Sequence, residues 1–330
     1  MPRFFPTKEN TMQPLLCRTM KRLSFLVFLC LCWAGQLSAQ EKIDIYGVEH
    51  FPESVSELDL HGPVKSVKYN TRTMKADTVL SEYGQRLYFN HIGLLVKRIY
   101  VSYGNVGEED TRIFTYDSLN RFESAYALDG TFFQKAIYDS LGRYSHSVYT
   151  RRDGIPKPSL RYFYDEQGRC IRNEYRPTDD EYELDYLVMQ HPFLYDSVGR
   201  CIETAEVVDG DTLDVKKIHF DASGRVVERM HVFFFIEPDR HLYDYDKDGK
   251  LIREQYFFDG KLSSTSFHEY DEQNRMKITK EYDKDGNITD IYRYSYDSFG
   301  NKIECVIESW KQGQKQEWFV QRTAEYEYWE

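Results

Sequence analysis

The chain has 330 residues, with 43 Lys and Arg against 54 Asp and Glu, so its formal net charge is −11. This acidic balance argues against nucleic acid as a partner, because binding to phosphates requires a basic surface. Aromatic residues make up 16% of the chain, including 27 Tyr and 21 Phe. A chain so rich in amphipathic rings suits half-buried strands better than helices.

Residues 1–39 have the pattern of a secretory signal peptide. Lys21 and Arg22 precede an apolar run over residues 23–33, and Ala39 ends the short segment that follows. This order of charged, apolar and small residues is typical of a cleaved export signal. Residues 1–19 are an upstream extension if translation begins at Met20.

The export signal predicts a periplasmic, cell-surface or extracellular protein. The apolar run is too short to span a bilayer, so no transmembrane segment is expected in the mature chain. Cys30 follows Leu29 and Cys32 follows Leu31, and neither leucine is the small residue that lipid attachment requires. We therefore expect no lipid anchor.

Residues 40–60 are expected to cap the domain that follows. The stretch 49–60 is the one place where a short helix is expected, with Ser54 as its N-cap before Val55 and Leu58.

A repeated motif fills most of residues 61–330. It reads aromatic, Asp or Asn, two variable residues, Gly or Asn, commonly a basic residue, and then commonly an apolar residue. Successive copies lie about 25 residues apart, which is typical of a repeat architecture. The copies begin at Phe89, Tyr116, Tyr138, Tyr164, Tyr195, Phe220, Tyr245, Tyr270, Tyr282 and Tyr296.

The copy at residues 164–170 shows what the motif does. Glu166 and Gln167 fit a type I turn, and Gly168 fits the left-handed position that closes a three-residue loop. Asp165 and Arg169 then form a cross-strand pair of opposite charge. The motif therefore predicts a β-hairpin whose aromatic residue faces a buried side.

A second turn recurs halfway between the motifs. Asp-Gly pairs mark it at residues 129–130, 153–154, 209–210, 259–260 and 285–286, and the last of these reassigns the copy at Tyr282 to this second class. Each repeat is thus two strands joined by alternating turns. The sequence predicts an all-β fold, an antiparallel meander of about 20 short strands in a long, curved, open sheet. We expect the charges of residues 325–329 to discourage pairing at the free final edge.

Three cysteines follow the signal segment. Cys170 and Cys201 occupy the apolar place after the motif glycine and are expected as core residues. Equivalent positions of neighbouring repeats lie roughly 9.5 Å apart, too far for a disulfide. Cys305 is expected on the opposite strand face.

The motif resembles a known repeat. Residues 138–143 and 195–200, Tyr-Asp-Ser-Leu-Gly-Arg and Tyr-Asp-Ser-Val-Gly-Arg, are similar to the YD repeat of Rhs-type and teneurin-type proteins, over about residues 60–330. Residues 245–251 with 260–262 also resemble a MORN-type hairpin repeat. The YD resemblance implies side-by-side hairpins at a cell surface, associated with glycan binding or encapsulation. The chain has no Asp-Pro, so self-cleavage and toxin delivery are not expected.

Few residues suggest chemistry of another kind. Asp244, Asp246 and Asp248 have the spacing that opens a calcium loop, but position twelve is Gln255 where the loop requires Glu. Turn chemistry already explains Asp246. The nine histidines show no zinc-ligand spacing, and His219, His241 and His268 are expected as half-buried cross-strand partners. No nucleophile or phosphate-loop motif occurs, so neither catalysis nor a cofactor is expected.

Aromatic residues outside the motif columns are the candidate binding residues. Such rings offer flat surfaces to sugars or to a partner protein. We expect them to be exposed, and they are Tyr100, Tyr103, Tyr182, Tyr186, Trp310 and Trp318.

The leading hypothesis is an exported, non-enzymatic β-repeat protein that binds a glycan or a surface protein through its sheet. One alternative is a carbohydrate-active hydrolase within the array, and another is a purely structural envelope protein. A hydrolase would require two close carboxylates, one of them with a raised pKa.

Overall fold

The computed structural model describes residues 54–102, 109–150, 156–158, 161–175, 189–233 and 237–330. Within these ranges 21 strands form one antiparallel sheet, and no helix occurs. Successive strands pair with one another across short turns. The predicted all-β meander is therefore confirmed.

The strands of the first half of the sheet are β1 (Val64–Lys75), β2 (Thr78–Phe89), β3 (Leu95–Ser102), β4 (Glu109–Tyr116), β5 (Phe122–Ala127), β6 (Phe132–Tyr138), β7 (Tyr144–Thr150), β8 (Pro156–Pro158), β9 (Arg161–Tyr164) and β10 (Cys170–Tyr175). Those of the second half are β11 (Met189–Tyr195), β12 (Cys201–Val208), β13 (Asp211–Phe220), β14 (Val226–Phe233), β15 (Asp239–Tyr245), β16 (Leu251–Phe258), β17 (Lys261–Tyr270), β18 (Met276–Asp283), β19 (Ile288–Tyr296), β20 (Lys302–Lys311) and β21 (Gln314–Tyr328).

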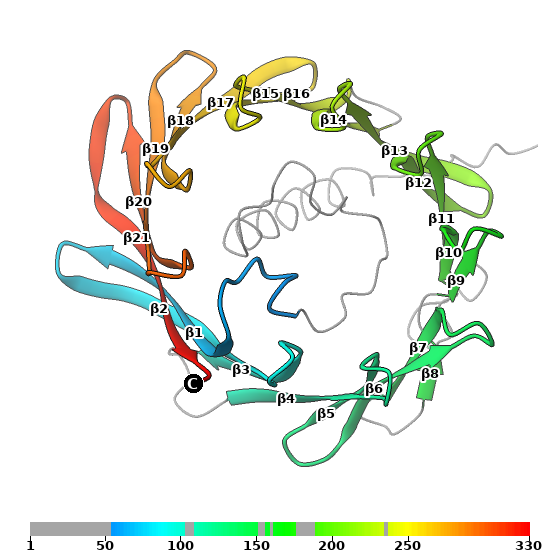
Figure 1. Ribbon diagram of the computed structural model, residues 1–330. Helices are drawn as coiled ribbons and strands as arrows, with labels where there is room; N and C mark the ends of the chain where they lie inside the picture. The colour runs from blue at the N-terminus through cyan, green and yellow to red at the C-terminus, as the bar shows by residue number, and fades with distance from the viewer. Residues whose placement is uncertain (1–53, 103–108, 151–155, 159–160, 176–188, 234–236) are drawn as a thin grey trace, which may run out of the picture.

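The sheet curls until its two ends meet. β1 pairs antiparallel with β21, from Val64 opposite Tyr328 to Lys75 opposite Trp318, and Figure 1 shows the resulting ring of strands. The ladders are interrupted at one place among the described strands. β8 pairs with β7 and β9 pairs with β10, but β8 and β9 do not pair with each other. The sheet is thus nearly closed rather than open at its first and last strands.

The charges of the last strand promote this closure, contrary to the expectation that they discourage pairing. Glu325 lies directly opposite Lys68, and the Lys68 Nζ atom is 3.2 Å from a Glu325 carboxylate oxygen. The Ser66 hydroxyl donates a hydrogen bond to Glu327. Opposite charges in register attract across a ladder, so these acids favour pairing with β1.

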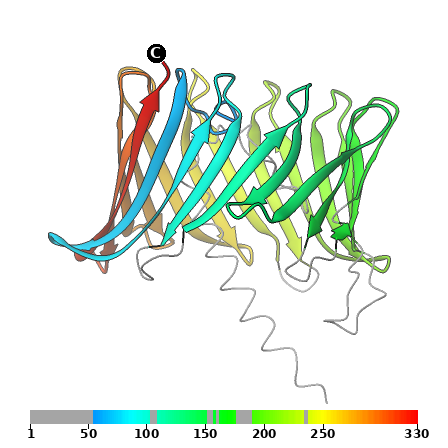
Figure 2. The same cartoon turned by 90° about the horizontal axis from the view of Figure 1, so that it is seen from below.

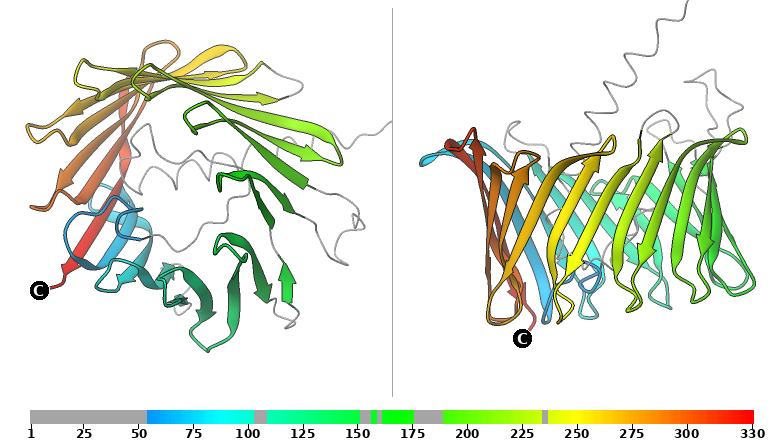
Figure 3. Two further views of the ribbon diagram at one scale, coloured as in Figure 1. Left: turned by 45° about the vertical axis from the view of Figure 1, so that its right-hand side comes forward. Right: turned by 90° about the horizontal axis from the view of Figure 1, so that it is seen from above.

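Turns of the two classes lie at opposite ends of the ring. Motif turns join β2 to β3, β4 to β5 and their equivalents, whereas the second class joins β1 to β2, β5 to β6 and their equivalents. Figure 2 and Figure 3 show the strands running between these two ends at a slant to the ring axis. We call them the motif end and the opposite end. The turn after Tyr282, at Asp283–Asn287, joins β18 to β19 and belongs to the second class, as predicted.

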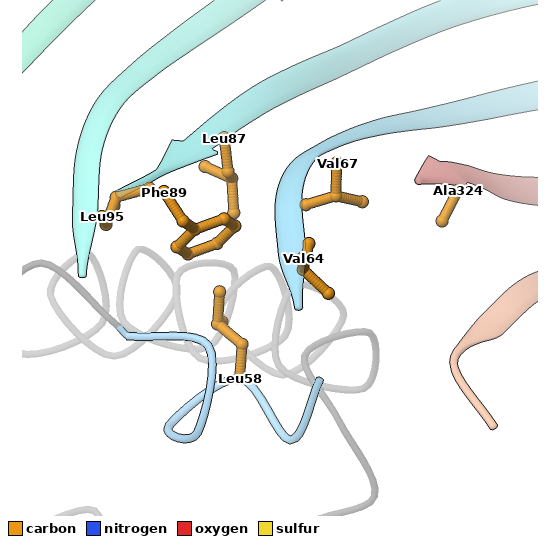
Figure 4. Packing of buried hydrophobic residues seen from close by; sticks show 7 residues of the cluster. All are labelled: Leu58, Val64, Val67, Leu87, Phe89, Leu95 and Ala324. Atoms are coloured by element: carbon orange, nitrogen blue, oxygen red, sulfur yellow. The ribbon is translucent and has the colours of Figure 1, made fainter. Parts of the chain in front are cut away.

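Residues 54–63 lie inside the ring and mark its inner face (Figure 1). Leu58, 5% exposed, packs against Leu87, Phe89 and Leu95, as Figure 4 shows. Ser54 caps a single turn here, because its hydroxyl accepts from the Glu57 N–H while Glu57 accepts from the Ser54 N–H. Residues 54–60 form this turn in place of the expected helix, and 49–53 lie outside the described residues.

A register shift follows the motif turns and changes which side chains face inward. Tyr296 pairs with Lys302, whereas Ser295 pairs with Glu304, so one residue of β20 is skipped. Cys305 consequently lies opposite Tyr294 on the inner face and is 1% exposed. The expectation that Cys305 faces the other side was wrong, since a bulge reverses the alternation of the strand. Cys170, Cys201 and Cys305 are free thiols, and Cys201 is buried as expected.

Candidate functional site

The motif residues form a structural rim at the motif end. In the turn at residues 165–169, the Gly168 N–H donates to the Asp165 carbonyl and Arg169 closes the loop, as predicted. The Arg169 Nε atom is 2.7 Å from the Asp165 carboxylate, and its guanidinium lies 5.0 Å from the ring centre of Tyr195 in the next repeat. The turns that carry a basic residue at this place, from Arg121 to Arg275, each make a cation–π contact with the aromatic residue of the next repeat.

The motif tyrosines add a ladder of hydrogen bonds. The Tyr270 hydroxyl donates to the Leu251 carbonyl at 2.8 Å, and the Tyr245 hydroxyl donates to the Val226 carbonyl at 2.8 Å. Burial raises the pKa of both hydroxyls to about 12. The same bond recurs at Tyr116, Tyr138, Tyr164, Tyr195, Tyr296 and Tyr326. These residues are accounted for by the fold, so a binding site must be sought elsewhere.

The inner face can be followed around the ring from Leu87, because residues directly opposite in a ladder share a face. Over β14 to β20 this register brings polar side chains together on the inner face. We call this group the inner polar belt. It comprises Arg229, His241, Tyr243, Glu254, Tyr256, Ser266, His268, Thr279, Glu281, Asp290, Tyr292 and Ser309.

Aromatic rings form one part of the inner polar belt. His241 and Tyr256 lie opposite each other and stack, with ring centres 4.6 Å apart and planes inclined by 29°. The ring of Tyr243 lies 6.5 Å from that of His241 in a parallel orientation. Burial lowers the pKa of His241 to about 4, with Arg229 acting in the same direction. His241 is therefore a neutral, flat ring at pH 7.

Carboxylates form the second part of the belt. Glu281 lies directly opposite Asp290 and, on its other side, Ser266. Burial raises the pKa of Glu281 to about 7, and the charges of Asp290 and Glu254 add to this effect. Like charges resist joint ionisation at close range, so Glu281 holds its proton part of the time near neutral pH. Ser309 donates a 2.7 Å hydrogen bond to Asp290.

Histidine links the carboxylates to the strand ladder. His268 Nε2 lies 3.0 Å from Glu254 and His268 Nδ1 lies 3.0 Å from the Thr279 hydroxyl. His241 on β15 and His268 on β17 are half-buried as predicted, whereas His219 is exposed and contacts Glu228.

Two further acids extend the polar inner face toward β13. The His231 Nε2 atom lies 2.9 Å from Asp214, and the Tyr256 hydroxyl donates to Asp239 at 3.3 Å. Burial raises the pKa of Asp239. Acidic and aromatic groups are thus continuous across the inner face from β13 to β20.

The predicted aromatic candidates lie apart from the belt. Tyr100 is on β3 at 36% exposure, where its hydroxyl accepts from Arg98 at 3.0 Å and its ring lies 5.7 Å from the Arg112 guanidinium. Trp318 is 41% exposed, as expected. Trp310 is half-buried with its indole nitrogen inaccessible, so its expected exposure was wrong.

β1 and β2 separate Tyr100 from the two tryptophans, and the structure does not bring these three rings together. The remaining candidates, Tyr103, Tyr182 and Tyr186, lie outside the described residues.

The aspartates of the candidate calcium loop do not converge. Asp244 bonds Arg253 across the β15–β16 ladder. Asp246 accepts from the N–H groups of Asp248 and Lys250, and the hydrogen bond from the Lys250 N–H leads in lowering its pKa. Across the described ranges, no group of three His, Cys, Asp or Glu side chains is placed to hold a metal ion.

Sequence reasoning missed the belt. Its carboxylates stand on ordinary strands with no motif spacing, and only the register of the sheet assembles them. An open hollow lies between β12 and β13, where Glu203, Lys217 and His219 line it. The described part of the chain contains no helix with the length and apolarity to cross a membrane.

Comparison with known proteins finds low-identity matches among solved structures. No family model and no curated protein matches the chain. The crystal structure of TcdB2-TccC3 aligns with 71% of this chain and 16% of its own at 11% identity, with a TM-score of 0.38. A porin-like protein from Bacteroides uniformis ATCC 8492 aligns with 81% of this chain and 99% of its own at 10% identity, with a TM-score of 0.37.

The chain therefore spans about one sixth of the length of the TcdB2-TccC3 chain. The motif, the hairpins that it forms and the stacking of those hairpins side by side identify the chain as a β-repeat protein.

Proposed function

We propose that the protein is an exported β-repeat protein of the YD-repeat type that binds a glycan on its inner polar belt. The observation that carries this proposal is that the stacked pair His241 and Tyr256 shares the inner face with the carboxyl groups of Glu254, Glu281 and Asp290, within five successive strands. The apolar face of a sugar ring packs on flat aromatic rings, and its hydroxyls donate hydrogen bonds to carboxylates. The belt offers both kinds of partner on one face.

The export signal in the sequence and the resemblance of the motif to YD repeats support the remainder of the proposal. Rings and acids on a curved inner face suit an extended ligand, because several repeats can each contribute a contact. The structural role of the motif residues leaves the belt as the surface that the repeat itself does not explain.

A glycan array with the purified mature protein tests the proposal, followed by titration of the strongest hit against variants. Tyr256→Ala should weaken that binding roughly tenfold or more, because one stacking platform is lost. Phe267→Ala is the matched control, since Phe267 is an aromatic residue of β17, 43% exposed and opposite Arg253 on the outer face.

Equal affinities of the two variants would contradict a site on the inner polar belt. An array without hits, together with a specific protein captured from envelope extract, would favour the surface-protein alternative. Failure of both experiments would refute a binding function.

A second candidate function, glycoside hydrolysis, is favoured by one observation. Glu281, with a pKa raised to about 7, lies directly across the ladder from Asp290. A protonated carboxylic acid beside an ionised one is the pair that glycosidases use as acid and base. Release of reducing ends from the array hit, abolished by Glu281→Gln and retained by Glu269→Gln on the outer face, would establish this activity.

A further inference from the structure

The motif end carries a row of exposed apolar side chains that neither the repeat nor the belt requires. Among the residues that the structure describes, nine motif turns lie at this end. In five of them the residue before the left-handed position is a large apolar residue with half or more of its surface exposed. These residues are Ile92 at 62%, Leu119 at 69%, Leu141 at 74%, Val198 at 72% and Phe299 at 50%. We call them the apolar rim.

The apolar rim covers a definite part of the circle. Because β21 pairs with β1, the turn of Phe299 is followed around the ring by those of Ile92, Leu119 and Leu141. Val198 comes after one turn that carries Gln167. The turns of β13 to β18 carry Ser223, Asp248 and Gln273 at the same place. One arc of the motif end is therefore apolar and the other polar.

Charge is balanced along most of the apolar arc. Asp117 is paired with Arg121, and Asp139 with Arg143, each at 2.7 Å. These turns have Ser at the place where the polar turns have Glu166, Lys247 or Glu272. Asp196 is paired with Arg200 in the same way, and the turn of Ile92 contains no Asp, Glu, Lys or Arg. The turn of Phe299 holds Asp297, which accepts hydrogen bonds from the Asn301 N–H and the Tyr328 hydroxyl and has no basic partner in the turn. The arc therefore presents apolar tips with one unbalanced carboxylate, which suits an apolar medium better than a highly charged partner.

The spacing of the tips distinguishes a lipid surface from a protein surface. Neighbouring motif turns stand two strand spacings apart, roughly 9.5 Å. Protein interfaces concentrate their energy in a packed central cluster and bury about 800 Å² on each side. Separate tips projecting from one end of a ring cannot form such a cluster, whereas the interfacial region of a bilayer accepts each tip independently.

A tryptophan at the same end fits this role. The backbone N–H of Trp329 donates to the Pro63 carbonyl, and the Trp329 ring lies 3.8 Å from that of His91, next to Ile92 in the turn. The Lys65 ammonium group lies 5.5 Å from the Trp329 ring. Tryptophan beside a basic side chain is typical of residues at a membrane–water interface.

We propose that the apolar rim docks the motif end onto the surface of a phospholipid bilayer. The tips of Leu119, Leu141 and their equivalents enter the interfacial region, and the strands stand above it. Phosphatidylcholine vesicles are the test surface, because the Asp and Arg of the turns at Leu119, Leu141 and Val198 are paired and leave no excess of basic groups for an anionic lipid.

Sedimentation of the mature protein with these vesicles measures the association. Leu119→Ser/Leu141→Ser should reduce the partition coefficient roughly tenfold or more, because two apolar side chains no longer leave water. Leu128→Ser/Leu213→Ser is the matched control, since Leu128 and Leu213 are 68% and 49% exposed near turns of the opposite end. This variant should bind as the wild type does.

A fluorescence measurement keeps the test independent of folding losses. The wild-type emission of Trp310, Trp318 and Trp329 is the reference. Leu141→Trp should add a blue shift beyond that of the wild type when vesicles are added, and Leu128→Trp should add none. An unbound wild-type protein at millimolar lipid, equal binding by the two double variants, or equal shifts at both ends would overturn the proposal.

Discussion

The carboxyl group of Glu281 lies in a setting that makes stability depend on pH. Its pKa is raised from 4.5 to about 7, first by burial and then by the charges of Asp290 and Glu254. As the pH rises past 4.5, the unfolded chain loses this proton while the folded chain keeps it, so stability falls until the pH reaches about 7. Above that pH both states are ionised and the loss is complete.

Glu281→Gln removes this penalty, because glutamine keeps the shape and cannot ionise. The variant should gain stability over the wild type between pH 4.5 and 7, reaching about 1–3 kcal/mol above pH 7. Thermal unfolding from pH 4 to 8 measures the difference. The control is Glu269→Gln, at an exposed acid that contacts Lys280 at 2.6 Å. A difference that is constant across this pH range would show that Glu281 has an ordinary pKa.

Sequence patterns single out the motif tyrosines rather than Glu281, and the physical reason is plain. Tyr270 and its equivalents recur because each donates to the repeat before it, so repetition exposes their role. Glu281 and Glu254 are not part of the repeated motif, and they stand on strands with an ordinary alternation of side chains. Glu281 and Glu254 lie near each other only because of the register in which their strands pair. That register depends on bulges, and the residue types do not predict where the bulges occur.

The hairpin is the element that the sequence describes best. Gly168 has a φ of +80° and a Cβ added there would meet no atom within 4 Å. Asn120 and Asn274 occupy the equivalent place with φ of 59° and 63°. The type I turn and its left-handed residue were therefore predicted from residue types alone, since few residues tolerate that conformation.

Gly168→Ala isolates the cost of the left-handed backbone, because the new methyl group has free space. The substitution should lower the free energy of unfolding by about 1–2 kcal/mol. Gly168→Asn should recover most of that loss, as Asn120 and Asn274 suggest. Urea denaturation of the three proteins measures this order, and an alanine variant as stable as the wild type would contradict the strain argument.

Closure of the ring is the property of the whole molecule that sequence alone did not predict. β1 and β21 lie at the two ends of the array, and each reads as an ordinary strand of alternating residues. Their compatibility rests on pairs such as Lys68 with Glu325, which are 257 residues apart. The local sequence pattern cannot predict such a pair, because it shows the charges on each strand but not which strand lies beside it.

A cross-strand disulfide tests the closure directly. Lys68→Cys/Glu325→Cys places two thiols at directly opposite positions of the β1–β21 ladder, within the range that a disulfide bridges. Mild oxidation should form this bond within one chain, detected by peptide mass spectrometry. By closing a very long loop, the bond should raise the free energy of unfolding by about 2–4 kcal/mol relative to the reduced protein.

Lys68→Cys/Glu269→Cys provides the matched control, since β17 is not a neighbour of β1. This pair should stay reduced within the monomer under the same oxidant. If the thiols at 68 and 325 also remained reduced, or joined separate chains instead, the two terminal strands would not be partners in solution. The sheet would then be open, and the apolar arc would be interrupted between Phe299 and Ile92. The result therefore also decides whether the apolar side chains of the motif end form one continuous arc.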